Sequence, residues 1–276
     1  MVSWLSIFSY AFIRRALIVG LCTSLSSSLL GVTLVLKRYS MIGDGLSHVA
    51  FGALAVSLAL GWSPLTVSLP VVVIAAFVLL RFTYSGSMAG DTSIAMISGV
   101  SLAIGVVASG LSKGMNSDVS GYMFGSILAL TPAYVAVGIL LSIAVVLTFV
   151  LGQGRIFSLT FDESFSKATG VPVDGFTLIL AGLTALNVVI GIRIMGALLI
   201  SSLIVFPPVI AMRWSKSFKG VVILSGIISM VGFVIGFWLS NIYSIATGAS
   251  VVLILALIYI ITILVSSWRK PITRRP

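Results

Sequence analysis

Charged residues are scarce in this sequence of 276 residues. Lysine, arginine, aspartate and glutamate make up 8% of the chain, whereas hydrophobic residues make up 59% and the mean hydropathy is +1.25. A soluble domain contains roughly 25% charged residues, so these side chains are too few to cover a soluble surface. The single cysteine, Cys22, excludes an intrachain disulfide and is interpreted as a small packing residue.

Sequence motifs for nucleotide binding and hydrolysis are also lacking. The chain has no GxxxxGK(S/T) phosphate-binding loop, so it cannot bind ATP in that way, and it has no HExxH or CxxC motif. One histidine, His48, and one glutamate, Glu163, leave little for general acid–base chemistry. The sequence therefore predicts a protein that is not an enzyme on its own.

Long apolar stretches recur along almost the whole chain. A helix needs about 20 apolar residues to span a bilayer, and nine stretches are candidates. These are residues 16–36, 41–60, 65–81, 93–112, 132–151, 174–192, 194–212, 220–240 and 247–266. We therefore predict an all-α polytopic transmembrane bundle, formed by residues 1–276 as one domain. The break near Arg193 is so short that an eight-span alternative stays open.

The basic residues indicate an orientation rather than a nucleic-acid partner. The net charge is +10, but lysines and arginines mostly flank apolar stretches, and the aromatic residues are not interleaved with them as in single-strand binders. With a cytoplasmic C-terminus and nine spans, twelve of the sixteen basic residues face the cytoplasm. Arg14 and Arg15 then fall outside, whereas eight spans would place both termini inside.

Asp44 and His48 are the most informative polar residues, because they lie at the start of an apolar stretch. Their spacing of four places both side chains on one face of a helix. Carboxylate and imidazole groups bind first-row divalent metals, and two ligands suit a transporter that must release its ion. Alternatively, the pair holds helices together, or Asp44 caps the helix. The adjacent Gly43 and Gly45 favour local unwinding that exposes carbonyl groups.

A second polar segment, residues 161–170, follows the fifth span and is cytoplasmic in this orientation. We predict a short amphipathic helix, with Phe161 and Phe165 on one face and Gly170 at its end. It is either an interfacial loop helix or a docking element for a cytoplasmic partner. The candidate docking residues are Phe161, Asp162, Glu163, Phe165, Lys167 and Gly170.

Five motifs in the same order resemble those of the membrane permease subunits of bacterial ABC importers for zinc, manganese or iron. They are Gly31–His48, Gly121–Ser126, Phe161–Gly170, Ile194–Pro208 and Thr247–Ser250. The sequence departs from this family at Pro207-Pro208, where many relatives have a single proline. The resemblance implies a type II ABC importer fold and a location in the bacterial cytoplasmic membrane.

The resemblance also implies partners and site residues. Two copies of the chain would pair, the segment near 161–170 would be a coupling helix that docks an ATP-binding cassette ATPase, and a lipoprotein or periplasmic protein would deliver the metal. Asp44 and His48 match the family's proposed contacts to the transported metal, and no cofactor is bound permanently. The alternatives are a permease for a metal chelate or cobalamin, a proton-coupled secondary carrier, and a scaffold that transports nothing.

Overall fold

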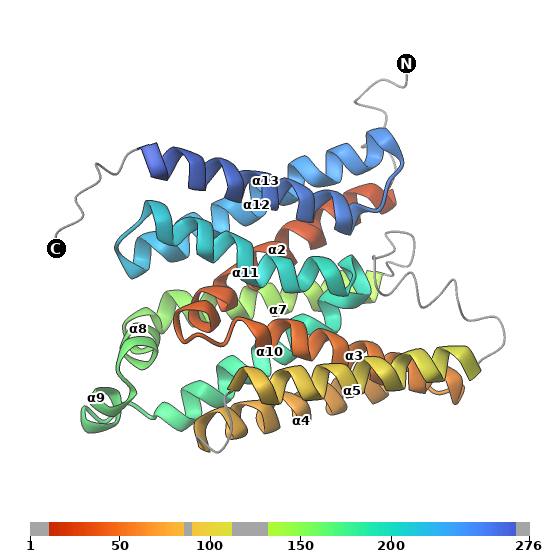
Figure 1. The fold of residues 1–276 in the computed structure, drawn as a ribbon, viewed down its shortest axis with the longest axis horizontal. Coiled ribbons are helices and arrows are strands. Elements are labelled where there is room, and N and C mark those ends of the chain that lie inside the picture. The colour runs from red at the N-terminus through yellow and green to blue at the C-terminus, as the bar shows by residue number, and fades with distance from the viewer. Residues whose placement is uncertain (1–10, 86–89, 112–131, 269–276) are drawn as a thin grey trace.

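The structure, a computed structural model, describes residues 11–85, 90–111 and 132–268, and within these ranges it contains helices and no strands (Figure 1). The helices are α2 (Ala11–Leu36), α3 (Met41–Ala59), α4 (Pro64–Ser85), α5 (Gly90–Leu111), α7 (Pro132–Leu151), α8 (Gln153–Phe161), α9 (Glu163–Ala168), α10 (Val173–Met195), α11 (Ala197–Trp214), α12 (Phe218–Tyr243) and α13 (Thr247–Trp268). The motif Gly121–Ser126 and the basic C-terminal residues lie outside the described ranges.

The predicted all-α transmembrane bundle is confirmed. Among the described residues, eight helices are long and apolar enough to cross a membrane, and α4 adds a shorter apolar stretch, Thr66–Leu79. A long helix covers each of the nine stretches that the sequence predicted. The break between the sixth and seventh stretches lies at Gly196 rather than at Arg193, because Gly196 has a φ of +89° that favours glycine. The helix α11 continues through both Pro207 and Pro208.

The helices pack in layers around α2 (Figure 1). The helix α2 contacts α7, α10, α11 and α12, whereas α3 packs mainly on α4 and α5 at the opposite side of the bundle from α13. The helix α11 contacts both α2 and α3 and so joins the two groups. The outer helices expose large apolar side chains, such as Met96 in α5 and Leu253 in α13, which suit contact with lipid or with another apolar surface.

Glycines allow the central helices to approach one another closely. A Cβ atom at Gly31 in α2 would overlap the carbonyl oxygen of Ile204 in α11, and one at Gly236 in α12 would overlap the backbone of Val251 in α13. Small residues permit such approaches in a membrane, where packing rather than the hydrophobic effect holds helices together. Glycine at these positions therefore permits the close packing of the helices.

A buried hydrogen-bond network crosses the centre of the bundle and was not predicted from the sequence. Asn187 in α10 is 1% exposed. Its Oδ1 accepts a hydrogen bond of 2.7 Å from Ser26, and its Nδ2 donates one of 2.8 Å to Ser27. Ser142 in α7 donates to Ser26 over 3.3 Å. The network connects α2, α7 and α10, and each of these polar groups has a partner away from water.

Candidate functional site

The Asp44–His48 pair lies in the first turns of α3, which begins at Met41 directly after a four-residue connection from α2. The Oδ2 atom of Asp44 and the Nε2 atom of His48 are 3.4 Å apart, so the predicted shared face is confirmed. Ser40 is the residue that precedes the helix, and Asp44 lies inside its first turn. The alternative in which Asp44 caps α3 is therefore excluded, although a carboxylate there is still favoured by the helix dipole.

The predicted unwinding near Gly43 and Gly45 is also wrong, because both residues lie within the continuous helix α3. Their role is close packing instead. A Cβ atom at Gly43 would meet the side chain of Ile204 in α11, and one at Gly45 would meet Ile94 in α5. The two glycines thus let α3 lie against α11 and α5 while the pair occupies another part of its surface.

The pair is not enclosed by packed protein. The side chain of His48 is 29% exposed and that of Asp44 is 44% exposed. Ser201 in α11 is a further polar neighbour of Asp44. Among the described residues, no group of three or more histidine, cysteine, aspartate or glutamate side chains is arranged to hold a metal ion. The pair can therefore supply two ligands, and the others must be water, hydroxyl or carbonyl oxygens, or groups outside this set.

Residues 161–170 contain the end of α8 and the whole of the short helix α9, rather than one amphipathic helix. Phe161 ends α8, and Asp162 then adopts an extended conformation and caps α9, where its Oδ1 accepts a hydrogen bond of 2.8 Å from the backbone N–H of Phe165. The prediction of one continuous helix with Phe161 and Phe165 on the same face is wrong, because the cap interrupts it. The predicted end at Gly170 is confirmed by its φ of +80°.

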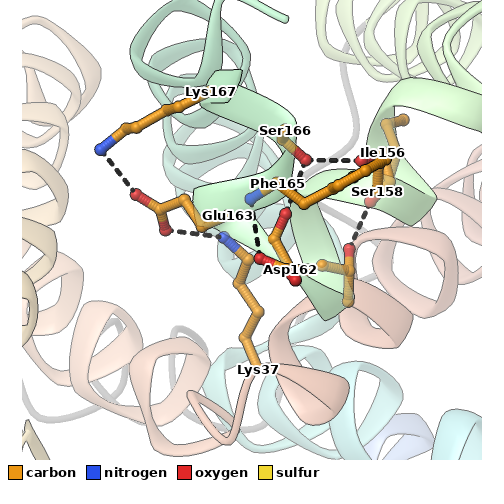
Figure 2. A network of polar contacts seen from close by, with 9 residues as sticks. Lys37, Ile156, Ser158, Asp162, Glu163, Phe165, Ser166 and Lys167 are labelled. Atoms are coloured by element: carbon orange, nitrogen blue, oxygen red, sulfur yellow. Dashed lines mark hydrogen bonds and ion pairs between the residues drawn. The ribbon is translucent and has the colours of Figure 1, made fainter. Parts of the chain in front are cut away.

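Glu163 lies between two lysines (Figure 2). Its Oε1 is 3.2 Å from Nζ of Lys167, one turn along α9, and its Oε2 is 3.9 Å from Nζ of Lys37, which follows α2. The side chain of Lys37 is only 15% exposed. Burial lowers the pKa of Lys37 from its ordinary value, and the Glu163 carboxylate partly offsets that decrease. Sequence reasoning treated Lys37 only as a marker of the membrane boundary.

Exposed phenylalanines gather near α9. Phe161 is 59% exposed and Phe165 is 60% exposed. Phe157 in α8 packs its ring 4.9 Å from that of Phe161, and Phe218 at the start of α12 contacts both rings edge-on. The buried Ser166 hydroxyl lies 2.6 Å from that of Ser158, which joins α9 to α8. The result is an apolar surface on two short helices that are fixed to the end of the bundle.

Comparison with known proteins defines the class. The model of the ABC 3 transport family matches residues 9–266, so this chain belongs to that family. It is a membrane permease of the ABC transporter type, with a multi-pass helical fold.

Individual relatives cover nearly the full length. The high-affinity zinc uptake system membrane protein ZnuB of Haemophilus influenzae is 28% identical, over 90% of this chain and 95% of its own. The manganese import system permease protein ScaB of Streptococcus gordonii is 24% identical, over 96% and 95%. The structure of PsaBC from Streptococcus pneumoniae in complex with Fab is similar at a TM-score of 0.80 and 25% identity, over 92% and 91% of the two chains.

Proposed function

We propose that this chain is the permease subunit of an ATP-driven importer that moves a divalent transition-metal ion, namely zinc, manganese or iron, into a bacterial cell. The observation that supports this function best is the Asp44–His48 pair, 3.4 Å apart and partly exposed within an otherwise apolar span. Ionisable side chains within transmembrane segments are rare and commonly mark ion pathways. The zinc and manganese systems named among the relatives support the same class of cargo.

In this mechanism the ion loses part of its hydration shell as it enters an outward-facing cavity, and Asp44 and His48 replace part of what is lost. The carboxylate contributes charge and the neutral imidazole contributes a nitrogen ligand. Since two protein ligands make an incomplete site, the ion can leave when the cavity opens to the cytoplasm. A separate lipoprotein or periplasmic protein delivers the ion.

Two copies of the chain form the conduit. Asp44, His48 and Ser201 form a polar area on a helical bundle whose outer helices expose many large apolar side chains. Such groups are poorly suited to lipid, so this area faces a second copy or a water-filled space between copies. The connection after α2, the helices α8 and α9 and the ends of α11 and α13 lie on the cytoplasmic side, in agreement with Lys37, Arg155 and Arg213 there.

The ATPase subunit docks on the cytoplasmic surface around α9. Phe161, Phe165 and the half-exposed Lys167 offer it apolar area and positive charge. Asp162 and Gly170 fix the two ends of α9 and thereby present those side chains. ATP hydrolysis on that partner moves α9 and drives the change from outward-facing to inward-facing states.

Uptake by the reconstituted permease–ATPase complex tests this function. Radioactive zinc, manganese and iron(II) are compared in competition, because affinity alone does not decide which ion is selected. We expect Asp44→Asn and His48→Gln each to reduce uptake to background while the amount of purified complex stays unchanged. Asp174→Asn is the matched control, since Asp174 also lies in the first turn of a helix and is exposed.

Normal uptake in either Asp44→Asn or His48→Gln contradicts the site. Uptake of a metal chelate or cobalamin in place of the free ion contradicts the proposed cargo. Uptake that follows a proton gradient without ATP identifies a secondary carrier instead.

A further inference from the structure

The connection between α2 and α3 is short and conformationally restricted. It consists of residues 37–40, and Arg38 has a φ of +63°, which is unfavourable for a residue other than glycine. The backbone N–H groups of Lys37 and Tyr39 donate to the carbonyl oxygens of Thr33 and Leu34 at the end of α2. A displacement of this connection therefore moves the start of α3, where Asp44 and His48 lie.

Lys37 links this connection to α9. Its ammonium group is largely buried and lies 3.9 Å from Oε2 of Glu163, while Lys167 within α9 holds the other carboxylate oxygen (Figure 2). A largely buried ammonium group is stabilised by an anionic partner, and truncating one member of such a pair is destabilising. The Glu163 side chain is 29% exposed, so most of it is turned toward the bundle and away from the surface where an ATPase would bind.

Side-chain packing links α9 to α2 indirectly, through α8, which contacts both helices. The helix α9 packs mainly against α8 and α10. A cavity of about 40 Å³ is lined by Lys37, Tyr39 and the start of α3, together with Leu159 in α8 and Thr177 in α10. The buried hydroxyl of Thr177 has no hydrogen-bond partner within the described part of the chain, which agrees with incomplete packing there. The ion pair between Glu163 and Lys37 is a direct contact between α9 and the residues that precede the metal pair.

We propose that Glu163 is a positioning residue that transmits the displacement of α9 through Lys37 to α3, and so to Asp44 and His48. This differs from the role in ATPase docking that the sequence predicted for Glu163. The proposal rests on the proposed function, because it requires an ATPase that displaces α9.

Charge reversal tests the link. Lys37→Glu, Glu163→Lys and the double variant are purified with the ATPase subunit and reconstituted into liposomes, and metal uptake per ATP hydrolysed is measured. Coupling free energies between sites correspond to changes of about 5- to 150-fold. We expect each single variant to lose on the order of tenfold in uptake per ATP, with ATPase co-purification retained, and the double variant to recover most of it.

Matched controls separate this effect from a change in surface charge. Arg38→Glu reverses a charge beside Lys37, and Asp174→Lys reverses an exposed one near α9; both are expected to keep uptake per ATP. Loss of ATPase co-purification in Glu163→Lys overturns the proposal, because Glu163 would then be a docking contact. A double variant no better than the single variants also overturns it.

A second measurement does not depend on the cargo. Met41→Cys, at the exposed start of α3, is introduced into a Cys22→Ser background so that one thiol remains. We expect ATP to change its alkylation rate in the permease–ATPase complex, the single charge variants to abolish that change, and the double variant to restore it. If ATP still changes the alkylation rate in the single charge variants, the proposed link between Glu163 and Lys37 is wrong. If ATP changes the alkylation rate as expected but the complex takes up no metal, the link between Glu163 and Lys37 is supported and the proposed cargo is refuted.

Discussion

Replacing Asn187 with alanine removes the centre of the polar network that joins α2, α7 and α10. The amide is 1% exposed and makes two side-chain hydrogen bonds, to Ser26 and Ser27. Ser26 keeps a second acceptor, the carbonyl oxygen of Thr23 at 3.0 Å, so its hydroxyl is not left without a partner. Asn187→Ala therefore lowers the free energy of unfolding through the loss of two hydrogen bonds and of the packing around one amide.

The magnitude follows from these contacts. Side-chain hydrogen bonds within membrane proteins contribute about 0.6 kcal/mol on average and about 1.7 kcal/mol at most, so two contribute about 1.2–3.4 kcal/mol. A void of roughly 25 Å³, at about 24 cal/mol per Å³, adds about 0.6 kcal/mol. We expect Asn187→Ala to lower the free energy of unfolding by about 2–4 kcal/mol.

Reversible unfolding of the purified protein in lipid–detergent micelles measures this difference. Asn241→Ala is the control, because Asn241 donates its hydrogen bond to the Phe237 carbonyl oxygen in its own helix and is exposed. It should change the free energy of unfolding by less than about 0.5 kcal/mol. If both substitutions lower the free energy of unfolding equally, the buried hydrogen-bond network is not what makes Asn187 important for stability.

Two further changes test local structure. Asp162→Ala removes the cap of α9 at a cost of about 1 kcal/mol, so hydrogen exchange of the Phe165 amide should accelerate about fivefold; an unchanged rate would show that the bond is not formed. Gly31→Leu places a side chain against the Ile204 carbonyl and should reduce the yield of folded protein strongly. Gly99→Ala should be tolerated or stabilising, because no described atom beyond its own stretch of helix lies within 4 Å of the added Cβ. Equal yields of these two variants would contradict the close approach of α2 and α11.

Local patterns predicted the bundle and the geometry of the Asp44–His48 pair. An apolar stretch long enough to span a bilayer can be recognised from the local sequence alone. A spacing of four residues on a helix likewise fixes which side chains are neighbours. The distance of 3.4 Å between the two side chains follows from that spacing. Their role in metal binding stays a prediction, because it depends on groups beyond one helix.

Interactions between distant segments were not predictable in the same way. Asn187 meets Ser26 across 161 residues of sequence and lies in an apolar stretch without a local partner. Lys37 meets Glu163 only because the bundle brings the ends of α2 and α9 together. The break at Asp162 was missed because an aspartate within a polar segment can equally be an exposed helical residue or a cap.

The single residue between α10 and α11 restricts how these two helices can move. Gly196 keeps the end of α10 beside the start of α11, so a rotation of one helix relative to the other leaves this joint almost stationary. The 18 residues of α11 extend about 27 Å at 1.5 Å per residue, and a rotation of about 10° displaces its far end by about 5 Å. The largest displacement in such a rotation therefore falls at Trp214, beside the connection to α12, and the smallest falls at the membrane face that contains Gly196.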